Sequence, residues 1–482
     1  MTRFLAKWRL LLALVAIAAF VQGVGHGQAV RLHPHRIAVF GSSVANGTGD
    51  ELGREGYTGL LRVLMANKGW EVVNQSRGGD STKTIVPRFA PAGAPDPRVR
   101  YLTTANPSYV VIGLSFGNEG LWEARTTAEK DAVYDGYLKG IRDLVDRARE
   151  NSIVPVVVLC YPRSVYTPQD YEYVRRANLE QSTWDVPAVN VLGAIDDGGG
   201  HWALGFDDKH PQASGHREFV YAFVPTLFEA LEKGKPTPTR PAGPASYARI
   251  AAGAAPLTFV PQETTMHPFA ISVMVRAQGD GTIAAISGAT LLARAETHQF
   301  AGAASPAAPS GRSFAATTLY TDKPFAASIG LQSGKWIYRS AAGPIVDSGM
   351  RADAQWHHLV LSHYAARGET LLYVDGKLGG RVAERLEPNR FVIGGPGASG
   401  AAAGPRQADY KDLLIYRAAL NADEVTALNQ GRLLHASLEI YSPLADVEFK
   451  VDSMVENRAQ SLTSLKVGPD RIAHLDDRTS TK

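Results

Sequence analysis

Cysteine is almost absent from the sequence, since Cys160 is the single one in 482 residues. An intrachain disulfide is therefore excluded. The fold has to be held by hydrophobic cores, which a chain of this length with 45% hydrophobic residues can supply. Cys160 ends the apolar run 153–160, so a buried and unreactive thiol is predicted.

An excess of charge of one sign is also lacking. The chain has 50 basic and 47 acidic residues, and three of the basic ones, Arg3, Lys7 and Arg9, lie within the first 29 positions. Beyond that segment, 47 basic residues face 47 acidic ones. The basic excess typical of nucleic-acid binding is missing, and no nucleic-acid partner is predicted.

The apolar run near the N-terminus is short for a membrane span. Residues 10–21 give 12 apolar positions, whereas a span needs about 20. The run follows basic residues and precedes the small residues Gly27 and Ala29, which is the pattern of a secretory signal peptide cleaved before Val30. Residues 1–29 are therefore predicted to be the signal peptide of a secreted or periplasmic protein. An uncleaved membrane anchor is the alternative.

Strands and helices alternate between Arg36 and about Lys233. The predicted strands are 37–40, 70–74, 109–114, 154–160 and a short one at 189–191, and the predicted helices are 58–68, 128–149 and 217–231. Such alternation indicates a parallel sheet covered by helices on both faces. Residues 30–233 are therefore expected to form one α/β domain.

The pattern changes after this domain. Residues 234–244 (GKPTPTRPAGP) are rich in Pro and Gly and indicate a linker, which we assign to 234–256. Residues 301–312 are expected to be a loop, and the extension 436–482, with strand-like runs at 438–441 and 447–451, either adds strands or packs across the domain junction. An antiparallel all-β sandwich is predicted over 257–435, with strands at 269–275, 281–286, 325–330, 335–339, 357–363, 370–374 and 391–394.

The stretch 36–47 (RIAVFGSSVANG) is the first candidate for chemistry. An apolar strand ends at Gly41, and Ser42 and Ser43 follow. In open α/β sheets ligands bind at the carboxyl edge of the strands. The two serines therefore stand where a nucleophile would be presented, although a glycine–serine loop of no chemical importance has the same appearance.

Three further stretches fall beside the same edge. Residues 74–82 (NQSRGGDST) and 113–120 (GLSFGNEG) each follow a predicted strand, and 206–215 (FDDKHPQASG) precedes the last helix. Each alone is typical of an ordinary turn. In the third, Asp207 and His210 are three residues apart, so a carboxylate can fix the imidazole tautomer within one tight turn. Together the stretches indicate an active site.

The four stretches in this order resemble the signature blocks of the SGNH (GDSL-type) hydrolase superfamily, over residues 36–232. The resemblance implies a flavodoxin-like three-layer fold and a serine hydrolase that needs no cofactor and no metal. It implies Ser43 as nucleophile, His210 as base and Asp207 as the acid that orients it. It also implies an oxyanion hole formed by Gly79 and the side chain of Asn118, with the amide of Ser43.

Three positions depart from the family pattern. Ser42 stands where the family has Asp, Phe116 stands where it has Gly, and Glu119 stands in place of Asp after the asparagine. None of these changes removes a catalytic group. Each alters the surroundings of one. His216, at the start of the last predicted helix, is expected to be structural or to line the site.

The second half resembles LamG/concanavalin A-like sandwiches of the jelly-roll type. The resemblance rests on the stretches 356–360 (WHHLV), 372–377 (LYVDGK) and 391–395 (FVIGG), and on a final strand and short helix within 409–431. It implies a fold and a possible glycan or protein ligand. It assigns no sugar or calcium site.

These observations predict an exported serine ester hydrolase that acts on acyl groups, most simply acetyl, carried by a carbohydrate. A glycan- or protein-binding protein that has lost catalysis is the alternative, favoured by the departures at Ser42 and Phe116. A lipase or phospholipase is a third reading, which the absence of an obvious apolar lid disfavours.

Overall fold

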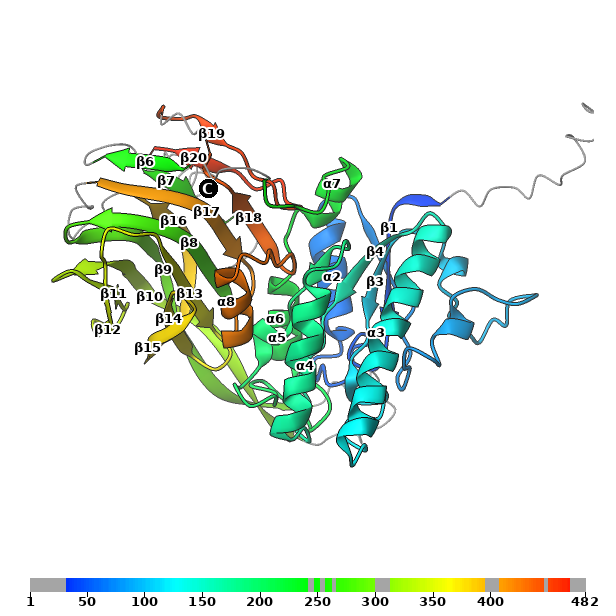
Figure 1. The fold of residues 1–482 in the computed structure, drawn as a ribbon. Coiled ribbons are helices and arrows are strands. Elements are labelled where there is room, and N and C mark those ends of the chain that lie inside the picture. The colour runs from blue at the N-terminus through cyan, green and yellow to red at the C-terminus, as the bar shows by residue number, and fades with distance from the viewer. Residues whose placement is uncertain are drawn as a thin grey trace, which may run out of the picture.

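The computed structural model describes residues 32–241, 247–251, 256–261, 266–299, 313–394, 407–445 and 450–468. The predicted signal peptide and the predicted loop 301–312 lie outside these ranges. Within them, no helix is long and apolar enough to cross a membrane. The chain forms an α/β unit and an all-β unit that lie side by side (Figure 1).

The α/β unit is built on a five-stranded parallel sheet with the strand order β2-β1-β3-β4-β5. This is the flavodoxin-like order, so the predicted parallel sheet is confirmed. Its strands are β1 (His33–Gly41), β2 (Glu71–Asn74), β3 (Pro107–Gly113), β4 (Val154–Val158) and β5 (Ala188–Val189).

Helices cover both faces of this sheet, because successive side chains of a strand point to opposite faces. In β1, Ile37 and Val39 belong to the core that includes residues of α2, α6 and α7, whereas Ala38 and Phe40 belong to the core beneath α3 and α4. The three-layer arrangement is thereby confirmed. The helices are α2 (Gly56–Ala66), α3 (Thr127–Glu150), α4 (Pro168–Gln181), α5 (Leu192–Ile195), α6 (Ala213–Tyr221) and α7 (Leu227–Glu232).

The prediction of one closing helix over 217–231 is wrong. The chain forms α6, leaves the helix after Tyr221 and starts α7 at Leu227. Pro225 lies between them, and proline has no amide hydrogen with which to continue a helix. Helix α4 was not predicted, although its N-terminus carries a capping box in which Thr167 and Asp170 satisfy each other's backbone amides.

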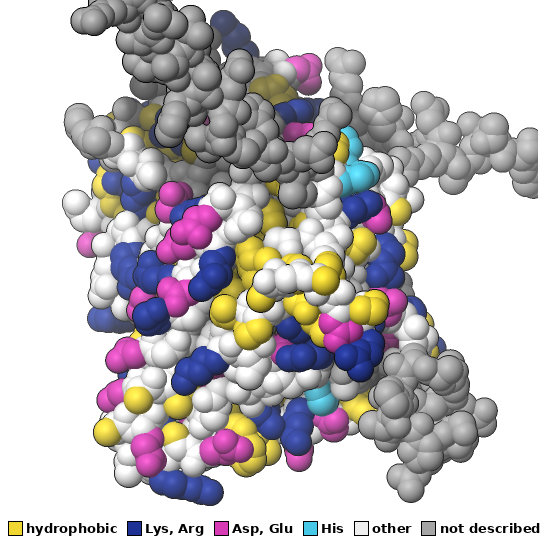
Figure 2. Space-filling model, turned by 90° about the vertical axis from the view of Figure 1, so that its right-hand side faces the viewer, with side chains coloured by type: hydrophobic (Ala, Val, Ile, Leu, Met, Phe, Trp, Pro, Cys, Tyr) yellow, Lys and Arg dark blue, Asp and Glu magenta, His cyan; other side chains and the backbone are white. Residues whose placement is uncertain are grey.

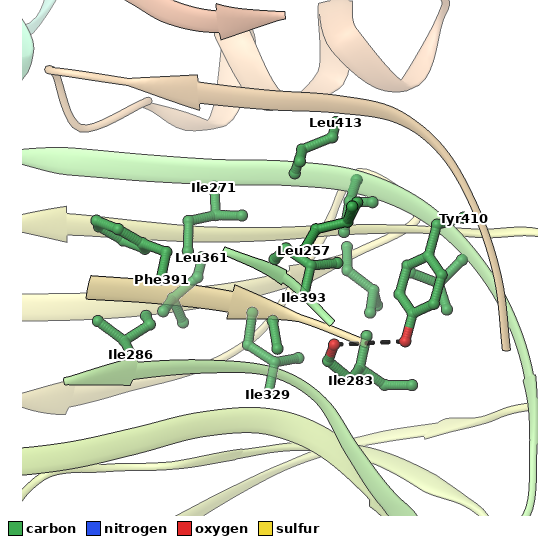
Figure 3. Close-up of a cluster of buried hydrophobic side chains, with 14 of the residues drawn as sticks. Leu257, Ile271, Ile283, Ile286, Ile329, Leu361, Phe391, Ile393, Tyr410 and Leu413 are labelled. Atoms are coloured by element: carbon green, nitrogen blue, oxygen red, sulfur yellow. Dashed lines mark hydrogen bonds between the residues drawn. The ribbon is translucent and has the colours of Figure 1, made fainter. Parts of the chain in front are cut away.

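The all-β unit consists of two antiparallel sheets, as predicted for a sandwich. Figure 3 shows the apolar side chains that fill the space between them, with Tyr410 donating its hydroxyl to the carbonyl of Ile283 at 3.4 Å. One sheet contains β12 (Ile345–Arg351), β11 (Lys335–Arg339), β10 (Ser313–Gln332), β9 (Gly281–Gln299), β16 (Leu386–Ile393), β7 (Leu257–Phe259), β20 (Leu465–Val467) and β19 (Met454–Val455). The other contains β15 (Lys377–Ala383), β14 (Glu369–Val374), β13 (His357–Tyr364), β8 (Phe269–Gln278), β17 (Gln407–Tyr416), β18 (Leu438–Ser442) and β6 (Ala248–Ala251).

The sandwich extends beyond its predicted bounds. Strand β6 lies within the stretch assigned to the linker and pairs with β17. The C-terminal extension contributes β18, β19 and β20, so it adds strands to the sandwich. Of the strand predicted at 447–451, residues 447–449 lie outside the described ranges and Val451 lies in a turn.

Buried polar contacts join the two units. Asn190, after β5, donates its side-chain amide to Glu424 of α8 (Ala422–Asn429) at 2.8 Å. The amide of Ser437 donates to the carbonyl of Ala188 at 2.9 Å, and that of His435 donates to the carbonyl of Ser182 at 2.7 Å. In Figure 1, α8 lies where the sandwich meets the helices of the α/β unit. The outer face of the β8-containing sheet is thereby covered.

Long strands of the sandwich also reach the loop that carries His210. In β10, the carbonyl of Thr317 accepts hydrogen bonds from Gln212 at 3.1 Å and from the Ser214 hydroxyl at 2.6 Å. The amide of Thr317 donates to the Gln212 side chain at 3.3 Å. The segment that follows His210 therefore rests on the second unit.

The interface gives a prediction for Glu424. Burial raises the pKa of Glu424 from its ordinary value of 4.5 to about 7. A carboxyl whose pKa is higher in the folded than in the unfolded chain stabilises the fold at low pH and loses that contribution as the pH rises from about 4.5 to about 7. In Glu424→Gln the group stays neutral and glutamine still suits the capping position. The fall in melting temperature between pH 5 and pH 8 should therefore be smaller in this variant than in the wild type.

Glu172→Gln, an exposed glutamate on α4, is the control and should keep the wild-type pH dependence. Identical melting curves for Glu424→Gln and wild type at every pH would contradict the prediction.

Candidate active site

The site begins where β1 and β3 end. A Cβ on Gly41 would lie 2.1 Å from the carbonyl oxygen of Gly113, so only glycine allows the two strand ends to approach so closely. The amide of Ser42 donates to that same carbonyl at 3.1 Å. The chain then turns away from the sheet and leaves Ser43 partly exposed at the carboxyl edge.

The structure brings Ser43, His210 and Asp207 together. His210 Nε2 lies 3.0 Å from Ser43 Oγ, and His210 Nδ1 lies 3.0 Å from both carboxylate oxygens of Asp207. Asp207 Oδ1 also accepts the amides of Lys209 at 2.7 Å and His210 at 2.8 Å. The three-residue spacing thus forms the tight turn expected of it.

The electrostatics of this turn fix the proton on one ring nitrogen. Burial would raise the pKa of Asp207, but hydrogen bonds from the His210 side chain and the Lys209 amide outweigh it and lower the pKa below its usual value. An ionised Asp207 accepts a hydrogen bond from Nδ1–H and so keeps the proton on Nδ1, which leaves Nε2 free to accept the hydroxyl proton of Ser43. This arrangement can activate a serine hydroxyl.

The side chain of Ser42 contacts Tyr161 instead of His210. Its side chain is only 3% exposed, and its Oγ lies 3.1 Å from the hydroxyl of Tyr161, in the loop after β4. Of the two adjacent serines, Ser43 is therefore the one within hydrogen-bond distance of His210.

His216 is a buried support for the start of α2. Its Nδ1 accepts the amide of Tyr57 at 3.2 Å, and its Nε2 donates to the carbonyl of Thr48 at 3.0 Å. Burial lowers the pKa of His216 to about 4, so the ring is neutral near pH 7. Both nitrogens are occupied by backbone groups, which agrees with the structural role expected for His216.

Asn118 lines the same cavity as Ser43 and His210. Its side-chain amide donates one hydrogen bond to the carbonyl of Asp80 at 3.0 Å. From the neighbouring loop, a Cβ on Gly78 would lie 3.8 Å from the Cβ of Ser43. Gly79 follows with a φ of +84°, and its Cβ position faces open space.

Glu119 ties the loops of Asn118 and Gly79 together. Its carboxylate accepts the amide of Thr82 at 2.6 Å and the hydroxyl of Thr82 at 3.0 Å. Burial raises the pKa of Glu119, and the two bonds from Thr82 offset part of that rise. The third departure, Phe116, is fully buried with its ring centre 4.4 Å from that of Tyr137, so it belongs to the core beneath α3.

The cavity beside Ser43 has a volume of about 40 Å³. One wall is formed by the loop after β4, which was not predicted to line the site although it too follows the carboxyl end of a strand. Cys160, at the start of this loop, is buried, and burial raises the pKa of its thiol to about 12, which confirms the buried thiol that was predicted. The lining residues are Ser42, Ser43, Val44, Ser115, Gly117, Asn118, Tyr161, Pro162, Arg163, Tyr166, Lys209 and His210.

Among the described residues, no group of three or more His, Cys, Asp or Glu side chains is placed to hold a metal ion. Figure 2 shows the face of the α/β unit turned away from the sandwich, where basic, acidic and hydrophobic side chains are interspersed.

Residues 39–218 match the GDSL-like Lipase/Acylhydrolase family. The matched range contains all the residues for which a role at the site was predicted, namely Ser43, Gly79, Asn118, Asp207 and His210. This match supports, for the α/β unit, the resemblance seen in the sequence. The likeness of the sandwich to LamG domains stays a prediction. A comparison with curated proteins gives no match.

Solved structures similar to parts of the chain share little sequence with it. A member of the lipolytic G-D-S-L family from Veillonella parvula is 15% identical, with a TM-score of 0.30, over 39% of this chain and 94% of that one. An acetylxylan esterase from Geobacillus stearothermophilus is 17% identical, with a TM-score of 0.30, over 40% and 93%. A pentraxin from Limulus polyphemus is 13% identical, with a TM-score of 0.27, over 39% and 84%. Values this low support no statement about activity.

The geometry predicts which serine reacts with a fluorophosphonate, a reagent that modifies serines activated by a neighbouring base. Ser43 should be labelled, because its hydroxyl contacts His210, whereas Ser42 should not. Peptide mass spectrometry after labelling measures this directly. The adduct should disappear in Ser43→Ala and persist in Ser42→Ala, and an adduct on Ser42 in the wild type would refute the assignment.

Proposed function

We propose that the α/β unit is a serine ester hydrolase in which Ser43 is the nucleophile, His210 the general base and Asp207 its orienting acid. The observation that supports this most directly is the pair of contacts on one imidazole, Nε2 to Ser43 and Nδ1 to Asp207, each at 3.0 Å. The family match at residues 39–218 agrees with hydrolysis of an acyl ester.

In the first half of the reaction, Ser43 Oγ attacks the ester carbonyl while its proton moves to His210 Nε2. The carbonyl oxygen then carries negative charge. The amides of Ser43 and Gly79 and the side chain of Asn118 are the donors proposed to stabilise it. Collapse of the tetrahedral intermediate breaks the ester bond, and the imidazolium gives its proton to the departing alcohol.

In the second half, water attacks the acyl group on Ser43 and loses a proton to His210 Nε2. Breakdown of the second tetrahedral intermediate releases the carboxylic acid and returns the proton to Ser43. Asp207 stays ionised throughout and stabilises the imidazolium each time it forms.

The size of the cavity favours a short acyl group. A buried water molecule occupies roughly 10–15 Å³ by the same kind of measure, so a cavity of about 40 Å³ admits about three such units, the size of an acetyl group. A long lipid chain does not fit this space, which disfavours a lipase. We propose that the substrate is an O-acetyl group carried by a carbohydrate. We also propose that the protein is exported through the predicted signal peptide.

The acyl preference can be measured with aryl esters of increasing chain length. The value of kcat/KM should be highest for the acetate and should fall by at least about tenfold for the octanoate, because a long apolar chain exceeds the space beside Ser43. Ser43→Ala should be inactive on every ester, and Ser42→Ala should keep a measurable rate. A preference for the octanoate would support the lipase reading instead.

Removing a proposed oxyanion donor should slow turnover without preventing folding. Asn118→Ala should lower kcat by about a hundred- to a thousandfold, the usual effect of losing one such donor. Because Asn118 also contacts the Asp80 carbonyl, the melting temperature is measured alongside. A variant with normal kcat and normal melting temperature would exclude Asn118 from the oxyanion hole.

A further inference from the structure

Arg163 is a buried cation in the wall of the cavity. It lies in the loop between β4 and α4, is only 8% exposed, and lines the same space as Ser43 and His210. Its amide donates to the carbonyl of Gly200 at 3.1 Å, which anchors the backbone of the loop. The backbone of Arg163 is therefore fixed, and its side chain is buried in the wall of the cavity.

Only some of the hydrogen-bond donors of the guanidinium have partners in the protein. One terminal nitrogen donates to the carbonyl of Gly117, and the group lies over the ring of Trp122 with its central carbon 5.0 Å from the ring centre. Its Nε is buried and has no hydrogen-bond partner. Within the described ranges, no carboxylate forms an ion pair with Arg163.

The other groups around the cavity add to this imbalance. Tyr166, three residues further along, is 3% exposed and its buried hydroxyl also has no hydrogen-bond partner. Lys209, which is exposed and adjoins His210 in sequence, also lines the cavity. No Asp or Glu is among the described residues that line the cavity. The space beside Ser43 is therefore lined by two cationic side chains, those of Arg163 and Lys209. It also has two buried donors without an acceptor, Arg163 Nε and the Tyr166 hydroxyl.

Such an arrangement is costly unless a ligand completes it. A guanidinium stays charged at any physiological pH, and a buried charge without a counter-charge destabilises the protein. An arginine with free nitrogens is well suited to a carboxylate, because its planar fork matches the two oxygens. Tyr166 can donate to the same group.

We propose that Arg163, assisted by Tyr166 and Lys209, selects substrates that carry a carboxylate next to the scissile ester. The proposal rests on the proposed function and names a substrate class for it. The carboxylate can belong to the alcohol, as in an acetylated acidic sugar, or to the acyl group, as in a hemiester of a dicarboxylic acid. The chemistry that Arg163 recognises is the same in both cases.

Matched pairs of esters separate the two sources. For the alcohol side the pair is 3-acetoxybenzoate and its neutral methyl ester; for the acyl side it is monophenyl succinate and phenyl butyrate. In the wild type, kcat/KM should favour the anionic member of one pair by about tenfold or more, the usual effect of a charged hydrogen bond. The pair that shows the preference identifies the source.

Arg163→Gln should abolish that preference, lowering kcat/KM for the anionic ester by about ten- to a hundredfold more than for its neutral partner. Arg163→Lys should restore part of it, because the charge remains. Lys139→Gln removes an exposed charge on α3 and should leave the ratio unchanged. If Arg163→Gln lowered kcat/KM equally for the anionic and the neutral ester, Arg163 would serve only to hold Gly117, and the proposal would be wrong. No anionic preference in either wild-type pair would also overturn it.

A binding measurement keeps this test independent of catalysis. Ser43→Ala protein is titrated with benzoate and with benzamide by calorimetry. Benzoate should bind more tightly, and the difference should vanish in the double variant Ser43→Ala, Arg163→Gln. Benzoate binding in a protein that hydrolyses no ester would leave the anion site standing and refute the proposed function. Hydrolysis of neutral esters without benzoate binding would support the proposed function and refute the anion site.

Discussion

The close approach of β1 and β3 at their carboxyl ends is the constraint on which the site depends. The backbone passes Gly41 with no room for a side chain, and the carbonyl of Gly113 takes up the next amide. Ser43 then leaves the sheet toward His210, while the chain after Gly113 leads to Asn118. A side chain at Gly41 would push the strand ends apart and would separate Ser43 from the loop that carries Asn118.

Much of this site was predictable, because its parts lie next to the strands that position them. The parallel order of the sheet brings strand ends to one edge, and the Asp207–His210 spacing closes a turn without help from distant residues. The resemblance implied Ser43 rather than Ser42, but the contact that turns Ser42 away was not predictable, since it depends on Tyr161, more than a hundred residues away. The charge of Arg163 was missed for a related reason: its importance lies in the partners it lacks, which only the folded chain reveals.

The sandwich was predictable only in part, because strands β6, β7, β12, β15, β19 and β20 were missed and others were predicted too short. The run 335–339 was predicted with its observed bounds, and its three central residues are all buried. Strands β9 and β10 continue far beyond the predicted runs 281–286 and 325–330. Their outer parts are rich in Ala, Thr and charged residues, and it is pairing with each other that makes them strands. Local sequence carries little of that information.

The polar contacts between the two units make each unit depend on the other for hydrogen-bond partners. Asn190 and Glu424 satisfy each other while buried, and Thr317 supports the segment after His210 with its backbone. If recombination replaced the sandwich with an unrelated one, these groups would lose their partners away from water. The α/β unit therefore depends on this particular sandwich to satisfy its buried polar groups.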